Sequence, residues 1–296
     1  MTKKINLLLL TLSLVGLTII QSCKSDDPAP VANVLIAGNR TTGKFYTVDE
    51  KTGATKEIFT PTYDGQTLNE VRAVAFHPKK NLYYLSQNSY TLDGNTQLGY
   101  LYSLNPTTKV ATRINQNNAV NGVVWDAIVN WAVAADDSLI SVGDFNNDGN
   151  GVVKFGTDGV RSKKTVESDI CCGLGMLYDA KTNKFILSNT GGYKNKVTIS
   201  DLDGATGTLT NQIDVITFTG FSEDFSVASN LSLKAMAQNG STASIFGLLY
   251  NGISASKKTY FVKIDLTAKS MTYISTIGAD NNNQYNNLTY VPANTF

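Results

Sequence analysis

One kind of segment recurs five times along this chain: a short run of β-prone residues that ends at Asn or Asp. Apolar residues bounded by Gly, Asn and Asp are typical of strands, and no helical period of 3.6 competes over a comparable length. The intervals between the terminal residues are 49, 56, 45 and 62 residues, which indicates an array of small sheets. The runs cover residues 34–39, 82–88, 139–144, 185–189 and 246–251.

A second β-prone run precedes each copy except the first, which has none before it. The missing partner stands at the other end of the chain, over residues 288–292. We therefore predict that the N-terminal strand pairs with the C-terminal blade, which closes a ring and removes an exposed sheet edge. The other preceding runs cover residues 74–78, 131–135, 174–178 and 233–237.

Two further strands joined by a turn follow the copies, most clearly at residues 45–58, 101–114 and 260–274. Asn, Asp and Gly supply the turn geometry. Four short strands in each radial repeat predict an all-β fold, a β-propeller of five blades. A sixth blade is the alternative if residues 195–240 contain another repeat.

The hairpins also resemble the "aliphatic/aromatic-Tyr-x-Leu-Asp-x-x-Thr-Gly" hairpins of a broad propeller class, which includes quinoprotein-like and surface-layer-like repeats. The segment from Phe45 to Gly53 is an example. The resemblance covers nearly all of the mature chain. It implies a hairpin and not a chemistry.

The first residues have the features of a secretory signal. A short basic start precedes an apolar run over residues 5–20, which is shorter than the roughly 20 residues of a membrane-spanning helix. Ile20, Ser22 and Cys23 resemble the lipobox of bacterial lipoproteins. The resemblance implies cleavage before Cys23 and lipidation of its thiol, which anchors the protein in a membrane. The alternative is an uncleaved anchor in which Cys23 is incidental.

A polar tether follows, because the stretch from Lys24 to Pro30 is charged, broken by proline and poor in apolar groups. Its Asp26 and Asp27 resemble the surface-export signal of Bacteroidetes lipoproteins, and Lys24 after the cysteine favours the outer membrane. We expect a surface-exposed outer-membrane lipoprotein of the cell envelope. The predicted parts are a signal peptide (residues 1–22), a lipidated tether (23–32) and a propeller domain (33–296).

The charge excludes one class of partner. The formal net charge is +1 and no long basic run occurs, so nothing in the chain favours binding to nucleic acid. The expected partners are the membrane, through the lipid, and an unidentified protein or glycan ligand.

The residues that end the five recurring strands are candidates for a polar ring in the central funnel. Equivalent positions of a propeller surround the same axis, and some propeller hydrolases bind calcium there. The alternative is a turn role, since Asn and Asp cap turns with their own side chains. One carboxylate among four amides is also a weak calcium site. The five residues are Asn39, Asn88, Asp144, Asn189 and Asn251.

A second calcium candidate overlaps this set. Asp144, Asn146 and Asp148 match the first half of a calcium loop, with Gly149 at the position of the sharp turn. Phe155 stands where the bidentate acid belongs, so a metal-free hairpin is the alternative. Calcium is the one cofactor that the sequence suggests, and none is required.

The remaining reactive residues are few. Cys171 and Cys172 are adjacent and form either a vicinal disulfide or, as we favour, a pair of thiols. His77 is the only histidine, so a Ser-His-Asp triad would have to use it. A turn residue before Pro78 is the favoured interpretation.

These features favour a non-enzymatic propeller that binds a ligand or a partner protein at the cell surface. The alternative is a funnel-site hydrolase or lyase, either with calcium or without it. A structural element of an envelope assembly is a third hypothesis. The fold alone does not separate them.

Overall fold

The computed structural model describes residues 32–90, 97–114, 119–120, 123–124, 130–144, 150–166, 173–189, 195–225, 231–252, 258–278 and 285–295. The chain divides into two units, Met1–Ala32 and Asn33–Phe296, and the second contains all the described residues except Ala32. Strands and turns make up the second unit where it is described. None of its described segments forms an apolar helix of membrane-spanning length.

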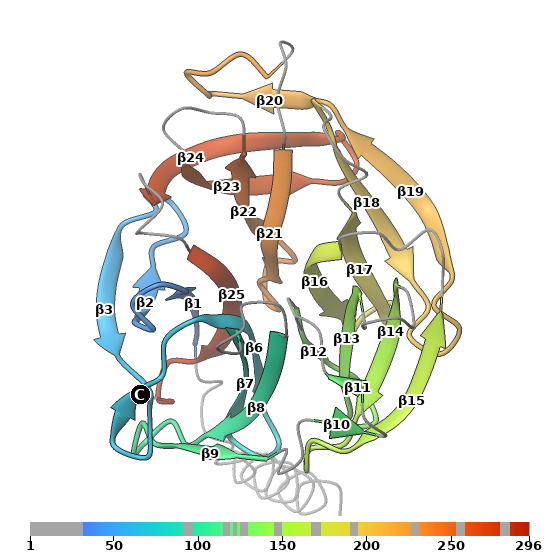
Figure 1. The fold of residues 1–296 in the computed structure, drawn as a ribbon. Helices are drawn as coiled ribbons and strands as arrows, with labels where there is room; N and C mark the ends of the chain where they lie inside the picture. The colour runs from blue at the N-terminus through green and yellow to red at the C-terminus, as the bar shows by residue number, and fades with distance from the viewer. Residues whose placement is uncertain are drawn as a thin grey trace, which may run out of the picture. The chain divides into compact units, whose positions relative to one another are not determined.

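The strands of the second unit form five sheets in a ring, a five-bladed β-propeller (Figure 1). From the innermost strand outward, blade 1 contains β25 (Tyr285–Pro292), β1 (Asn33–Asn39), β2 (Phe45–Val48) and β3 (Thr55–Phe59). Blade 2 contains β6 (Val71–His77), β7 (Leu82–Tyr90), β8 (Gln97–Leu104) and β9 (Ala111–Arg113). Blade 3 contains β12 (Ala132–Val133), β13 (Leu139–Asp144), β14 (Asn150–Phe155) and β15 (Arg161–Val166).

The remaining blades follow the same order. Blade 4 contains β16 (Gly173–Asp179), β17 (Lys184–Asn189), β18 (Val197–Leu202) and β19 (Leu209–Val215). Blade 5 contains β21 (Leu231–Gln238), β22 (Ile245–Asn251), β23 (Thr259–Asp265), β24 (Ser270–Gly278) and β20 (Thr217–Thr219). Two small hairpins pair β4 (Thr62–Tyr63) with β5 (Gln66–Thr67) and β10 (Ala119–Val120) with β11 (Val123–Val124).

The ring closes as the repeat pattern predicts. Strand β1 pairs antiparallel with β25, from Asn33 opposite Pro292 to Gly38 opposite Asn287, so the N-terminal strand completes the C-terminal blade. The innermost strands β25, β6, β12, β16 and β21 contact one another in turn around the ring. These contacts join the five strands into a closed ring.

The alternative of a sixth blade is wrong. Residues 195–240 are used by blades 4 and 5: β18 and β19 form the outer hairpin of blade 4, and β21 is the innermost strand of blade 5. Between them, β20 adds to the outer edge of blade 5 as a fifth strand, parallel to β24. The extra length of this repeat therefore covers an edge that would otherwise present unpaired backbone groups.

Asp and Asn side chains build the turns of the outer hairpins. The Asp49 carboxylate accepts hydrogen bonds from the backbone N–H of Lys51 (3.0 Å) and Thr52 (2.8 Å). Gly53 follows with a φ of 67°, and a Cβ there would lie 1.8 Å from the Ser275 hydroxyl oxygen. Asn105, Asp203, Asn239 and Asp265 accept equivalent bonds in other turns. The recurrent Asp-x-x-Thr letters are thus explained by a local side-chain cap.

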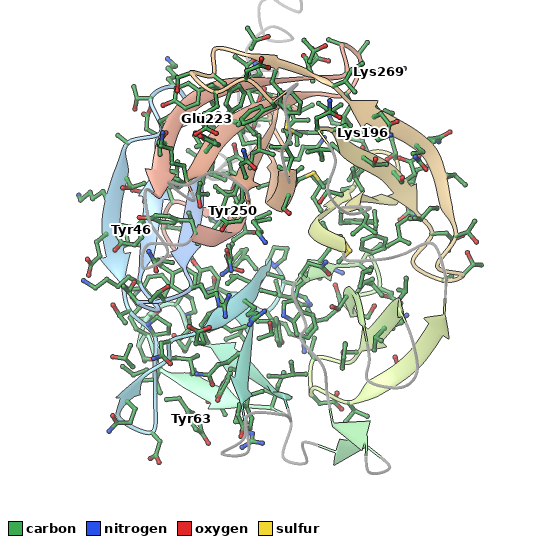
Figure 2. All side chains as sticks on the ribbon, turned by 45° about the horizontal axis from the view of Figure 1, so that its top comes forward. Tyr46, Tyr63, Lys196, Glu223, Tyr250 and Lys269 are labelled. Carbon is green, nitrogen blue, oxygen red and sulfur yellow. The ribbon has the colours of Figure 1, made fainter. Side chains whose placement is uncertain are left out.

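Five clusters of buried apolar side chains hold the ring together, one between each pair of neighbouring blades (Figure 2). Strand alternation produces this arrangement, because successive side chains point to opposite faces. Leu35 and Ala37 of β1 pack toward blade 5, whereas Ile36 between them packs toward blade 2. Burying one such leucine or isoleucine stabilises the fold by about 1.5–3 kcal/mol.

Candidate functional site

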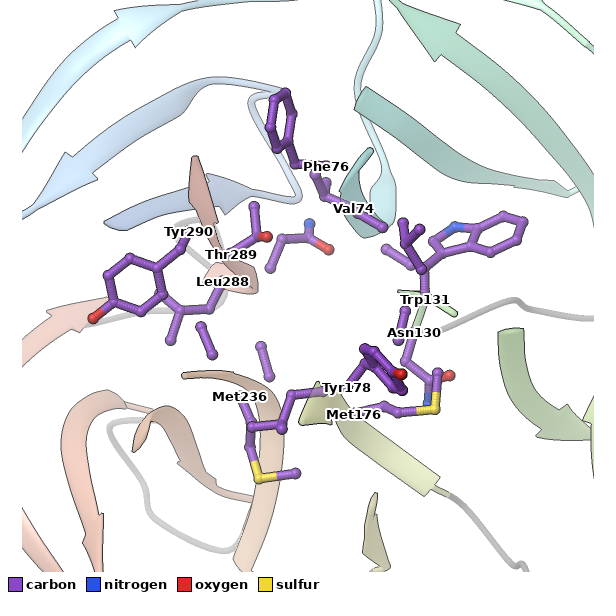
Figure 3. Close-up of a pocket in the computed structure, with 18 of the residues that line it drawn as sticks. Val74, Phe76, Asn130, Trp131, Met176, Tyr178, Met236, Leu288, Thr289 and Tyr290 are labelled. Carbon is purple, nitrogen blue, oxygen red and sulfur yellow. The ribbon is translucent and has the colours of Figure 1, made fainter. Parts of the chain in front are cut away.

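The five innermost strands surround a cavity of about 370 Å³ on the ring axis (Figure 3). Val74, Met176, Met236 and Leu288 form much of its apolar wall, and each comes from a different blade. Ligand sites combine such apolar walls with a few polar groups. The polar or charged side chains that line it are Lys79, Asn130, Asp137, Tyr178, Lys234, Gln238, Asn286, Asn287, Thr289 and Tyr290.

A one-residue irregularity interrupts the pairing of four innermost strands, β6, β16, β21 and β25, and in three neighbouring ones, β6, β21 and β25, the extra residue is polar. In β6, Val71 pairs with Gln87 and Ala73 with Ser86, so Arg72 is an extra residue. An extra residue makes a β-bulge, which takes its side chain out of the normal alternation and re-aims it. Near the start of β6, β21 and β25 the bulge therefore presents a polar side chain.

The two equivalent bulges lie in β21 and β25. Lys234 is the extra residue between Leu233 and Ala235, which pair with Leu249 and Leu248. Asn286 is the extra residue of β25, since Tyr285 pairs with Asn39 and Asn287 with Gly38. Because β21, β25 and β6 are consecutive around the ring, the three bulges bring together Lys234 and Asn286, which line one mouth of the cavity, and Arg72, whose charge acts on Lys234.

Lys234 is the most perturbed of these groups. Burial, together with the positive charges of Arg40 and Arg72, lowers its pKa to about 8. Its ammonium lies 5.1 Å from the centroid of the Tyr250 ring, a cation–π distance. Figure 2 places Tyr250 toward the inner part of the ring. Among the residues that the structure describes, the Lys234 ammonium has no hydrogen-bond acceptor and no ion-pair partner.

Arg40 differs from Lys234 because it has a counter-charge. Its Nε donates to the Glu70 carboxylate at 2.6 Å. The backbone N–H of Glu70 in turn donates to the carbonyl of Arg40 at 2.8 Å, which joins the loop after β1 to the start of β6. The mouth therefore contains one paired and one unpaired cation beside Arg72.

Hydrogen bonds between blades make this mouth rigid. The Asn287 amide donates to the Val71 carbonyl at 3.1 Å, from blade 1 to blade 2. The Ser188 hydroxyl accepts a hydrogen bond from the Gly175 N–H at 2.8 Å. It donates one to the Leu233 carbonyl at 3.0 Å, from blade 4 to blade 5. These bonds fix the strands next to the bulges, so the polar groups are positioned before any ligand arrives.

A different set of charges lies at the other end of the innermost strands. The Lys79 ammonium is 2.9 Å from the Asp137 carboxylate, which is the only acid among the described residues that line the cavity. The hydroxyl of Tyr290 donates to Glu50 at 2.8 Å, and Asn239 donates to the same oxygen at 2.9 Å. Each of these charged groups therefore has a partner within the protein.

His77 is buried at the end of β6 and is not an exposed turn residue. Its Nε2 lies 3.9 Å from the Asp137 carboxylate, and its ring is 6.0 Å from the ring of Tyr84. Neither ring nitrogen has a hydrogen-bond partner in the described part of the chain. A Ser-His-Asp relay is therefore not assembled among the described residues.

The strand-terminal residues occupy their expected places, although their proposed ring is described only in part. Asn39 and Asn251 are buried at the ends of β1 and β22, and neither is among the described residues that line the cavity. The Asn39 side chain accepts from the Thr42 N–H at 3.1 Å, a turn cap. Asp144 and Asn189 end β13 and β17, whereas Asn88 lies two residues before the end of β7; the side chains of all three lie outside the description.

Other predicted residues also lie outside the described part of the chain: Cys23, Asn146, Asp148, Cys171 and Cys172. The lipidation site, the calcium loop and the state of the cysteine pair thus stay predictions. Within the described ranges, no group of three His, Cys, Asp or Glu side chains is placed to hold a metal ion.

A groove of about 830 Å³ lies between blades 3 and 4. Its walls carry two ion pairs, Lys154 with Asp136 and Lys184 with Asp201 (2.7 Å). Hydrogen bonds from Lys154 and Ser138 lower the Asp136 pKa to about 2, so this pair stays ionised at neutral pH. The charges that line the groove are thus largely satisfied within the protein, unlike Lys234.

Comparison with known proteins shows that this chain shares its fold, but no recognised sequence family, with proteins of known structure. No protein-family model matches the chain, and no curated protein matches it. The similar solved structures include a protein of unknown function from Bacteroides caccae, with a TM-score of 0.48, 9% identity, and coverage of 88% of this chain and 99% of that one.

Two other similar structures are described by the kind of protein that they are. A TolB-like protein from Agrobacterium tumefaciens gives a TM-score of 0.48 at 9% identity, covering 90% of this chain and 100% of that one. A periplasmic gluconolactonase from Pseudomonas aeruginosa gives a TM-score of 0.46 at 10% identity, covering 84% of each chain. The assignment to the propeller class rests on the strand order and register of this chain.

Proposed function

We propose that this protein is a lipoprotein, anchored at the outer membrane through Cys23 and exposed at the cell surface, whose propeller binds a small ligand in its central cavity. The observation that carries the binding role is the set of three bulges, which bring polar side chains to one mouth of a cavity whose wall contains apolar residues from four blades. The anchor and the location rest on the sequence around Cys23.

The chemistry of the cavity supports binding more than hydrolysis. Glycoside cleavage by paired acids requires two carboxyl groups about 5–10 Å apart. Asp137, the one acid among the described lining residues, is engaged by Lys79. Rigid, pre-positioned donors above an apolar wall are instead what a ligand-binding site requires.

A thermal-shift screen of the detergent-solubilised full-length protein tests the cavity as the binding site. Organic acids, amino acids, sugars and nucleotides form the library. A ligand at a hundred-fold excess over its Kd stabilises the native state by about 2.7 kcal/mol, which raises Tm by several degrees. Thr289→Tyr should abolish the shift, because Thr289 lines the cavity and a tyrosine there narrows it.

The matched control is Thr112→Tyr, which places the same side chain on the exposed face of β9. It should retain the full shift. A ligand that shifts both variants equally would bind outside the cavity, and a library without any hit that depends on Thr289 would count against the proposed function.

A further inference from the structure

We propose that the cavity mouth formed by Lys234, Arg72 and Asn286 is a subsite for the oxyanion group of a small organic acid, a carboxylate or a phosphate, with the rest of the ligand in the apolar cavity. This inference rests on the proposed function and specifies the ligand class. Three observations support it: the geometry of the bulges, the balance of charge at the mouth and the composition of the cavity wall.

The bulges explain how charged side chains come to lie at the axis. A regular innermost strand sends its side chains alternately into the two apolar clusters beside it, where an ammonium group would be costly. As the extra residue of β21, Lys234 avoids both clusters and lines the cavity. The repetition of the bulge in β6 and β25 places Arg72 and Asn286 beside it.

The charge balance points to an anion. Three cations, Lys234, Arg40 and Arg72, lie close enough together that the two guanidinium groups disfavour the charge on the lysine. Glu70 neutralises Arg40. Lys234 has only the face of the Tyr250 ring as a favourable electrostatic contact within the described part of the chain. A partly buried cation of this kind is stabilised when an oxyanion binds next to it.

The apolar wall of the cavity indicates that the rest of the ligand is an organic group. Val74, Met236 and Leu288 are apolar and lie deeper in the cavity, which has a volume of about 370 Å³. A free inorganic ion would leave these surfaces without contacts, whereas an organic acid fills them. The Asn286 amide can donate a hydrogen bond to the acidic group, and Arg72 adds positive charge beside it.

Chemical labelling of lysines in the full-length protein tests the subsite directly. The reactive form of a lysine is the free amine, and an anion that raises the pKa by one unit lowers that fraction about tenfold at neutral pH. Three probes with a common ring are used at constant ionic strength: benzoate, phenyl phosphate and the neutral benzamide. Acetylation of each lysine is measured by mass spectrometry, with exposed Lys269 as the internal reference.

We expect benzoate or phenyl phosphate to protect Lys234 about tenfold and to leave Lys269 unchanged. Benzamide should give little protection. Protection by benzoate alone assigns a carboxylate, and protection by phenyl phosphate alone assigns a phosphate. Equal protection by benzamide would overturn the anion subsite but leave a cavity ligand in place. Lack of protection by either anion would overturn it as well, and the library screen then decides whether the cavity binds neutral molecules.

Two substitutions of the same kind provide the matched pair. Lys234→Gln removes the charge at the mouth, and Lys263→Gln removes an exposed charge on β23. The rise in Tm caused by the protecting anion should vanish in Lys234→Gln and persist in Lys263→Gln. Retention of the full rise in a folded Lys234→Gln protein would contradict the inference, and if that variant does not fold, labelling of the unmodified protein gives the answer.

Discussion

Lys234 illustrates how a single residue can be tuned by its place in the backbone. The residue stands in a strand that the repeat pattern predicts correctly, and its letters give no sign of special function. The bulge, the neighbouring guanidinium groups and the Tyr250 ring together produce a lysine that titrates near pH 8. In its charged form this lysine lowers the free energy of unfolding, and a bound anion would offset that loss.

This cost predicts an unusual pH dependence. The pKa of Lys234 falls from the ordinary 10.5 to about 8 on folding, so between these values the unfolded state binds more protons than the native state. Stability therefore rises with pH across this window, by at most about 3 kcal/mol. Lys234→Met should remove this rise and should be more stable than the unmodified protein at pH 7 without ligand.

The measurement is urea unfolding of both proteins from pH 7 to pH 10, compared as a difference so that other groups cancel. Burial raises the pKa of Tyr102 to about 12, so tyrosines act in the opposite direction only near and above their unfolded value of 10. An identical pH slope for the two proteins would show that Lys234 does not titrate in this window.

The blades were predictable from sequence because each strand signal is local. The five recurring runs, their preceding partners and the hairpins with Asp or Asn caps all overlap observed strands, with ends that differ by at most four residues. The bulges were not predictable in the same way, because an extra residue is defined by the pairing of two strands. A hint exists in retrospect: Val71-Arg72-Ala73-Val74-Ala75 and Leu233-Lys234-Ala235-Met236-Ala237 share an apolar-basic-Ala-apolar-Ala pattern.

The hairpin caps give a prediction at the scale of one element. In the turn between β18 and β19, the Asp203 carboxylate accepts from the N–H of Ala205 (2.7 Å) and Thr206 (3.0 Å). Asp203→Ala should lower the free energy of unfolding by about 1 kcal/mol, since the turn loses both acceptor contacts. Asp203→Asn should retain most of the stability, because Asn105 makes the same two contacts in its own turn.

Denaturant unfolding of the three proteins measures this effect. If Asp203→Asn were as destabilised as Asp203→Ala, the negative charge rather than the acceptor geometry would stabilise the turn.

At the scale of the whole molecule, the first and last strands share one blade, and the predicted lipid anchor precedes that blade by about ten residues. The repeat pattern predicted the ring closure, since the first copy lacks a preceding strand and the last strand lacks a copy. The predicted count of five blades is confirmed, and the alternative of six fails because the long fourth interval, of 62 residues, adds an edge strand and not a repeat.

The anchor predicts a clear change of location. Cys23→Ala should release the protein from the membrane fraction and abolish incorporation of an alkyne-tagged fatty acid, whereas Cys171→Ala should do neither. Protease treatment of intact cells should remove the propeller from the unmodified protein if it faces the medium. Membrane association and labelling of Cys23→Ala would refute the lipobox, and full protection of the propeller on intact cells would refute surface exposure.

The pairing of β1 with β25 has a consequence for biogenesis. Strand β1 is synthesised before the other strands of the propeller and its partner β25 after them, so one edge of blade 1 stays unpaired until the other blades have been synthesised. Pairing over so long a sequence separation is also slow to form. Before the ring closes, the chain therefore passes through an open arc with an exposed strand edge, the state in which a chaperone would protect it from aggregation.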